Sequence, residues 1–101
     1  MKRMINAHDL PDFEVSDYLE DADAIAEYLT IVLEDGDPSL LIAALGDIAR
    51  AKGMSEVSRE SGLAREALYK ALRAGAQPRF DTVMRVLRTL GVRLVAQPLS
   101  A

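Results

Sequence analysis

Residues 54–73 read MSEVSRESGLAREALYKALR, and this stretch is the most informative part of the sequence. Two short amphipathic segments flank Gly62, a residue type that tolerates the positive φ needed in a tight turn between two steeply crossed helices. Ser58, four residues earlier, is small where the two helices must approach most closely. The pattern predicts a helix-turn-helix, and its apolar positions predict the buried seam: Val57, Leu63, Leu68, Ala71 and Leu72.

The opposite side of the second segment is polar and mixes cations, a carboxylate and a phenol. Such a face supplies donors and acceptors for base edges and phosphates, so the stretch favours DNA binding. The alternative is an ordinary helical hairpin whose polar side is merely solvated. The residues of this candidate DNA-binding face are Arg65, Glu66, Tyr69, Lys70 and Arg73.

Length and composition set the class of protein. A chain of 101 residues corresponds to one small domain. It contains no cysteine, which excludes disulfides and thiolate metal sites and is compatible with a reducing compartment. No run approaches the roughly 20 apolar residues of a membrane span, and the first residues lack the apolar core of a signal peptide. We therefore expect a cytoplasmic protein without a membrane partner.

The formal net charge of -4 conceals a division between the two halves of the chain. Residues 1–47 hold two basic and twelve acidic residues, whereas residues 48–101 hold ten basic and four acidic ones. Because charges beyond a Debye length of about 8 Å are largely screened, the acidic total does not exclude a basic surface facing DNA. The acidic half either attracts a basic partner or only keeps the chain soluble.

Apolar residues at helical spacing predict three more helices. The first starts at residue 21 or 23 and ends before Gly36. The second starts at Asp37-Pro38, a capping residue followed by proline at the first helical position. The third follows a loop at residues 75–78 and keeps Arg85 and Arg88 exposed. The apolar stripes are Ile25, Tyr28, Leu29 and Val32 in the first helix, Leu41, Ala44, Leu45 and Ile48 in the second, and Phe80, Val83, Leu87 and Leu90 in the third.

Residues 92–96 read VRLVA, and their β-branched residues and alternation predict a short strand. A single strand leaves backbone donors and acceptors unpaired. It is expected to pair either with residues 13–15 or with its own copy in a second subunit, which would give a two-fold dimer. The expected organisation is one compact domain, in which residues 1–36 form an acidic N-terminal segment and helix and residues 37–101 the helix-turn-helix part with the strand.

Three stretches carry a resemblance to a known family: EDGDPSL at residues 34–40, GLAREALYKAL at 62–72 and PRFDTVMRVLRTLG at 78–91. Over residues 13–94 the chain is similar to addiction-module antidote proteins, HigA-like antitoxins with a phage-repressor (Cro-type) helix-turn-helix. The resemblance implies an all-α, five-helix, phage-repressor-like domain that binds double-stranded operator DNA as a homodimer and represses its own module. It also implies neutralisation of a small basic RelE-like or ParE-like toxin of the HigB type.

Carried over to this chain, the family's recognition helix falls on residues 64–73 and its operator-facing positions on the polar face described above. The chain departs from the general pattern at three positions. Ala64 replaces the usual capping Ser or Thr, at a cost of about 1 kcal/mol. Met54 stands where many such domains have a phosphate-binding Gln, and Ser61 where an apolar residue often precedes the glycine. These departures bear on the phosphate contacts rather than on the fold.

If the acidic half binds a basic toxin, affinity should come from apolar anchors on that half. The candidate toxin-binding residues are Tyr18, Leu19, Tyr28 and Val32. Two other functions remain open: a stand-alone phage-type transcriptional regulator that uses the same operator surface without a toxin, and an interaction module whose helix-turn-helix is vestigial.

An enzyme is not expected. His8 is the sole histidine, and no cysteine accompanies it. The acidic residues Glu20, Asp21 and Asp23 lack the glycine-centred spacing of a calcium loop, so a charged helix N-terminus explains them better. The sequence predicts no catalytic residues, no metal site and no cofactor.

Overall fold

The computed structural model describes residues 21–99, and over them it is all-helical. Five helices follow one another, as the sequence predicts, and this part of the chain contains no strand. They are α2 (Ala22–Asp35), α3 (Pro38–Lys52), α4 (Met54–Ser61), α5 (Arg65–Leu72) and α6 (Phe80–Thr89).

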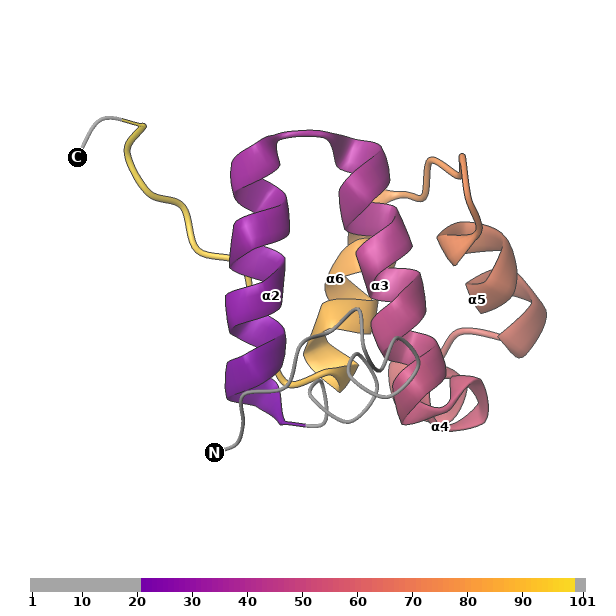
Figure 1. Ribbon diagram of the computed structural model, residues 1–101. Helices are drawn as coiled ribbons and strands as arrows, with labels where there is room; N and C mark the ends of the chain where they lie inside the picture. Colours follow the sequence, from indigo (N-terminus) through magenta and orange to yellow (C-terminus); the bar gives the residue numbers. More distant parts are fainter. Residues whose placement is uncertain (1–20, 100–101) are drawn as a thin grey trace, which may run out of the picture.

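The hairpin of α2 and α3 is fixed by its caps (Figure 1). Gly36 ends α2 with a left-handed φ of 86°, and its N–H donates to the carbonyl of Leu33. One residue later, the Asp37 carboxylate accepts hydrogen bonds from the backbone N–H and the hydroxyl of Ser39, at 3.0 and 2.8 Å. Pro38 occupies the first turn, where its missing N–H costs nothing. The predicted stop and restart are both confirmed.

Helix α3 is the centre of the domain, since it packs against α2, α4, α5 and α6. Figure 1 shows α2 beside it, α6 behind and the α4–α5 pair on its other side. The apolar stripes predicted from the sequence meet here in one core, except for Phe80, which is 67% exposed because it stands at the first position of α6. The largest fully buried side chains come from four helices: Leu45 and Ile48 from α3, Val57 from α4, Leu68 from α5, and Val86 and Leu87 from α6.

Gly46 lets α5 lie close to α3. It is buried on the side of α3 that faces the end of α5. A Cβ atom placed on it would be 3.0 Å from the carbonyl oxygen of Leu72 and 3.2 Å from the guanidinium of Arg50. Glycine is an unfavourable residue inside a helix, so this close approach is the physical reason for its presence.

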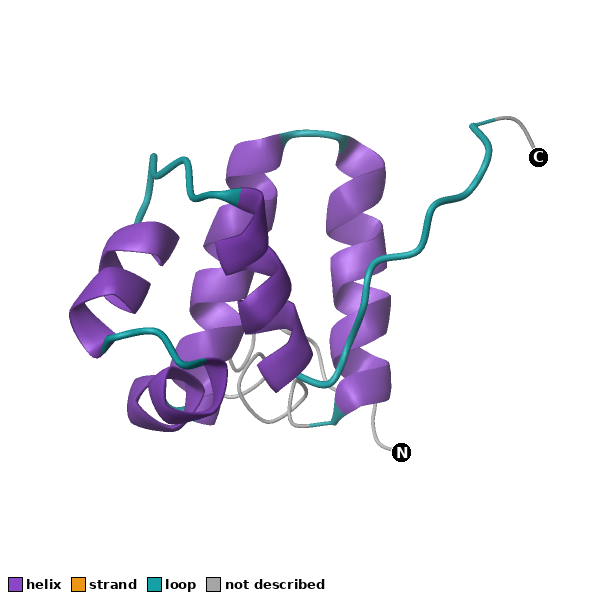
Figure 2. Cartoon of the chain, turned by 180° about the vertical axis from the view of Figure 1, so that it is seen from behind, coloured by secondary structure: helices purple, strands orange, loops and turns teal. Residues whose placement is uncertain are grey.

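The predicted strand at residues 92–96 is wrong. Residues 92–98 have no regular secondary structure, and their backbone crosses the α2 side of the molecule (Figure 2). The alternation itself is present, because Val92 and Leu94 pack against the core while Arg93 and Val95 are exposed. A strand also needs a ladder partner, and within the described residues only the Val92 N–H of this segment is bonded to backbone, at 3.1 Å from the Leu87 carbonyl. The proposed partner at residues 13–15 lies outside the described residues.

The close approach at Gly46 predicts that valine destabilises the domain more at this position than on the exposed side of α3. Replacing Gly46 by Val should lower the free energy of unfolding by about 1–3 kcal/mol, because the new side chain meets the Leu72 carbonyl. The matched control is Ala43→Val on the exposed side of the same helix, where only helix propensity changes, by about 0.5 kcal/mol. Urea unfolding of both variants measures the difference. Equal losses would show that α3 and α5 are not in tight contact at this glycine.

Candidate nucleic-acid interface

The turn between α4 and α5 comprises residues 62–64 and is held by hydrogen bonds from α4. Gly62 has a φ of 79° and its N–H donates to the Ser58 carbonyl at 3.1 Å, so the predicted left-handed glycine is confirmed. The Ser58 hydroxyl donates to the Leu63 carbonyl. Ser61 accepts from the Leu63 N–H at 3.2 Å and donates to the Ser58 carbonyl at 3.3 Å. Ser58 is therefore not only small enough for a close approach of the two helices. Together with Ser61 it also provides hydrogen-bond partners for backbone polar groups of the turn.

Helix α5 sits on α3 and α4 through its apolar side. Leu68 is fully buried and Leu72 nearly so, while Ala71 is half-buried. With Val57 and the half-buried Leu63, these residues form the seam that the sequence predicts. The five residues of the candidate DNA-binding face are all exposed on the other side: Arg65, Glu66, Tyr69, Lys70 and Arg73.

Two of these residues form a pair on the helix surface. Arg65 Nη2 donates to the Tyr69 hydroxyl at 3.3 Å, and Arg65 Cζ lies 5.4 Å from the centre of the Tyr69 ring. The spacing of four residues brings the two side chains together, and the geometry is that of a cation–π contact. Tyr69 thereby restricts the guanidinium without neutralising it. No carboxylate among the described residues lies within ion-pair distance of Arg65, Lys70 or Arg73.

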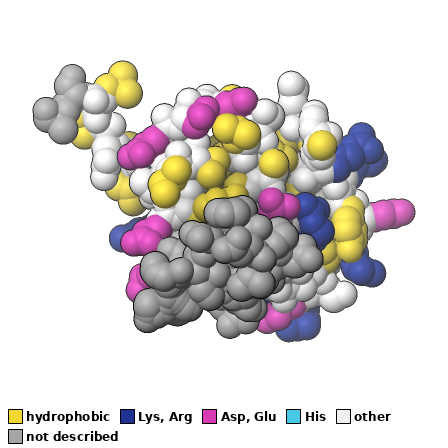
Figure 3. All heavy atoms as spheres, viewed as in Figure 1, with side chains coloured by type: hydrophobic (Ala, Val, Ile, Leu, Met, Phe, Trp, Pro, Cys, Tyr) yellow, Lys and Arg dark blue, Asp and Glu magenta, His cyan; other side chains and the backbone are white. Residues whose placement is uncertain are grey.

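Charge is unevenly placed over the surface. From residue 21 to residue 35, α2 and its cap carry five carboxylates and no cation. Figure 3 shows carboxylates along the α2 side of the molecule and most Lys and Arg side chains of this view over the α4–α5 side. On this face of the molecule, the acidic side of the sequence and the basic side therefore lie largely apart.

The predicted toxin-binding residues fall into two groups. Tyr18 and Leu19 lie outside the described residues. Tyr28 and Val32 are half-buried and pack against the core, so each offers only part of its side chain to a partner. Ile31, which is off the helical stripe and was not selected from the sequence, is 67% exposed. The sequence signal that could have predicted its exposure is an apolar residue that falls outside the helical repeat of the buried side.

Other chemistry is sparse in the described part. No group of three or more His, Cys, Asp or Glu residues within residues 21–99 could hold a metal ion. No helix among those residues is both long and apolar enough to cross a membrane. In the first turn of α6, the hydrogen bond from Arg79 Nε, at 3.0 Å, lowers the pKa of the exposed Asp81 carboxyl.

Comparison with known proteins identifies the family. The family model described as "probable addiction module antidote protein" matches residues 9–98. The chain belongs to this family of addiction-module antidotes. An uncharacterized protein of Haemophilus influenzae is 42% identical over 88 residues, which cover 87% of this chain and 91% of that protein. No solved structure matches the chain. The protein is thus an antidote, or antitoxin, of an addiction module, and the resemblance seen in the sequence is confirmed at that level.

The start of α5 offers a test of the turn geometry in this antidote. Ala64 takes the N-cap position with extended backbone angles and no side-chain hydrogen bond. Ala64→Ser should therefore raise the free energy of unfolding by about 1 kcal/mol, because its hydroxyl can accept from an unpaired N–H of the first turn. The control is Ala43→Ser, an exposed position well inside α3 where the neighbouring N–H groups are already bonded within the helix, which should slightly destabilise. No gain at Ala64 would show that α5 begins at another residue.

Proposed function

We propose that this antidote binds operator DNA through the exposed face of α5 and represses its own module. The observation that supports the proposal is the combination of a helix anchored by buried leucines with an exposed polar face. Leu68 and Leu72 fix the position of α5, and the five face residues project away from the core. A helix held this way can enter the major groove, where an α-helix fits and base edges are distinguishable.

The proposed contacts follow from the order of residues along α5. Arg65 and Glu66 stand in the first turn, where recognition helices approach base edges most closely. A guanidinium suits the O6 and N7 acceptors of guanine, and a carboxylate can accept from the amino group of cytosine. Tyr69 restricts Arg65 before binding, which reduces the entropy lost on contact. Lys70, in the last turn of α5, and Arg73, the residue directly after the helix, suit phosphates.

The second part of the proposal is neutralisation of a small basic RelE-like or ParE-like toxin of the HigB type. Its support is the charge of α2, whose carboxylates have no cation among them. Complementary charge speeds encounter between partners, and apolar anchors supply most of the affinity. The anchors proposed are the accessible parts of Tyr28 and Val32 together with Tyr18 and Leu19. The antidote is further proposed to act as a homodimer, in keeping with the two-fold symmetry of repressor operators.

Operator binding can be tested by alanine substitution on α5. Arg65→Ala or Tyr69→Ala should cost about 1–3 kcal/mol, concentrated at particular base pairs. Lys70→Ala or Arg73→Ala should weaken binding to all sequences alike and flatten its dependence on salt. Gel shifts on the promoter region of the module measure both effects.

The matched control for these variants is Arg88→Ala, which removes one exposed cation from α6 and leaves α5 unchanged. Loss of one positive charge affects the control and the three variants that remove a cation equally, whereas Tyr69→Ala removes no charge. Wild-type binding by all four α5 variants would remove this helix from the interface. Losses of DNA affinity no larger than that of Arg88→Ala would show that the α5 cations act only through their charge and make no specific contact.

Toxin steering predicts a salt-dependent association rate. The pair of substitutions Glu27→Gln and Glu34→Gln on α2 should slow association with the copurified basic partner at low salt, with a smaller effect on dissociation. The pair Glu56→Gln and Glu60→Gln on α4 removes the same charge elsewhere. Stopped-flow mixing measures the rates. Equal slowing by both pairs would argue against α2 as the docking side, and the lack of any basic partner in copurification would leave a stand-alone regulator.

A further inference from the structure

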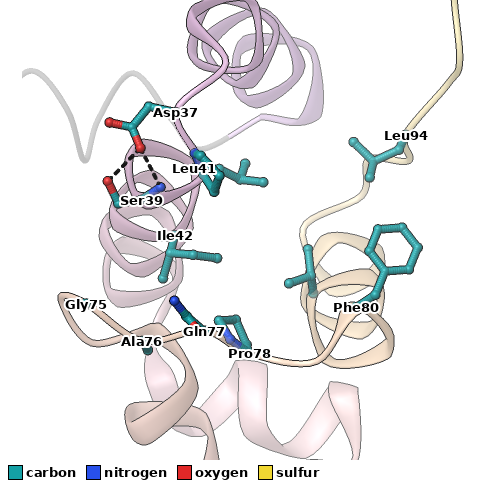
Figure 4. A pocket seen from close by; sticks show the side chains of 12 residues that line it. Asp37, Ser39, Leu41, Ile42, Gly75, Ala76, Gln77, Pro78, Phe80 and Leu94 are labelled. Carbon is teal, nitrogen blue, oxygen red and sulfur yellow. Dashed lines mark hydrogen bonds between the residues drawn. The ribbon is translucent and has the colours of Figure 1, made fainter.

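An apolar groove runs between the start of α3 and the start of α6. Its volume is about 640 Å³, within the range of sites that hold ligands or peptide side chains. Figure 4 shows Leu41 and Ile42 on one wall, Phe80 and Leu94 on the other, and the loop of Gln77 and Pro78 at the base. The Asp37 carboxylate at the rim is engaged by both donors of Ser39.

Phe80 is largely exposed at the edge of this groove. The sequence places it on the apolar stripe of α6, yet its side chain is 67% exposed, whereas Val83, Leu87 and Leu90 of the same stripe are buried. The difference arises because Phe80 is the first residue of α6 and extends past the end of the core. An aromatic ring left in water at the edge of an apolar groove is typical of a surface that another polypeptide covers.

The described residues also include an exposed apolar segment, residues 95–99. After Leu94, which forms part of the groove wall, residues 95–99 lead away from the body of the molecule (Figures 1 and 2). Val95 is 67% exposed and Leu99 fully exposed. Because side chains alternate along an extended backbone, Val95 points away from the core that Leu94 contacts.

We propose that residues 95–99 of one copy lie in the groove of a second copy, and that the exchange is reciprocal. The inference rests on the homodimer of the proposed function and names its interface. Five extended residues span roughly 16 Å, enough to leave one molecule at Leu94 and enter another beside it. A two-fold axis near Leu94 makes both contacts identical, as an isologous dimer requires. The exposed groove and the exposed segment then bury each other in the same contact.

Return of the segment to its own groove is the competing arrangement. It requires the chain to reverse direction directly after Leu94, whereas the backbone there continues away from the groove (Figure 4). Docking of a toxin segment in the groove is the other alternative. The apolar segment beside the groove favours a second copy, since a toxin in the groove would leave Val95 and Leu99 in water.

Disulfide trapping can decide between these arrangements because the chain has no cysteine of its own. A Leu99→Cys variant is mixed with a Gln77→Cys variant under mild oxidation, and mixed disulfides are measured by mass spectrometry. Gln77 lines the groove, so the two variants should form an interchain bond in high yield. The control mixes Leu99→Cys with Ile31→Cys, whose position on α2 is exposed but outside the groove. Equal yields in the two mixtures would overturn the proposal.

A double variant carrying Leu99→Cys and Gln77→Cys distinguishes the two chain paths. An excess of wild-type chain leaves it no cysteine-bearing partner. The proposal predicts that the bond joins two copies of the double variant and therefore disappears under that dilution. A bond that persists would place the segment in its own groove and overturn the exchange.

Sedimentation equilibrium measures how much residues 95–99 and the groove contribute to the stability of the dimer. Truncation after Leu94 should raise the dimer Kd at least a hundredfold, since each dimer loses two Leu99 side chains from an apolar site. Phe80→Asp should act in the same direction, while the equally exposed Ile31→Asp should not. Circular dichroism checks that the truncated chain keeps its helices.

The outcomes separate this inference from the proposed function. A wild-type chain that is monomeric at every concentration would remove the dimer and the exchange together. A truncated chain with unchanged Kd would keep the dimer and place its interface elsewhere. Copurification of the basic toxin and gel shifts on the promoter report independently on the antitoxin and repressor functions, and neither result depends on the groove.

Discussion

The contact between α3 and its four neighbours is the constraint on which the rest of the domain depends. An α-helix is about 10 Å across with its side chains, and four helices share the surface of this one. Small residues make that possible, because Ala44, Gly46 and Ala49 are all buried in α3. Where α5 comes nearest, even a methyl group would press on the Leu72 carbonyl. The orientation of the exposed α5 face therefore follows from side chains on a different helix.

Local signals account for what the sequence predicts well. The capping of α3 by Asp37, the left-handed Gly36 and Gly62, and the helical stripes each depend on residues within a few positions, so they can be read before the fold is known. The strand at residues 92–96 fails for the opposite reason. Alternation shows that Val92 and Leu94 face one side, but a strand is defined by a partner distant in sequence, and no local pattern supplies one.

Of the candidate site, the sequence predicts well only what depends on local pattern. The exposed face of α5 follows directly from helical period and is where the sequence places it. Tyr28 and Val32 were selected as partner contacts from the stripe that marks the buried side of α2, and they pack on the core accordingly. Phe80 was assigned to a stripe that is correct in register, but a stripe does not show where the core ends. The place where the buried core ends, rather than the register of a helical stripe, is what the sequence left unspecified.

The two eight-residue helices, α4 and α5, have a further consequence. Helices this short are not stable alone in water, since nucleation costs more than so few hydrogen bonds return. The α5 surface therefore forms only in the folded domain, because α5 does not stay helical once the α3 core is lost. Loss of the α3 core therefore abolishes the proposed operator surface completely, so a cell that unfolds or degrades this antidote loses that surface at once rather than by degrees.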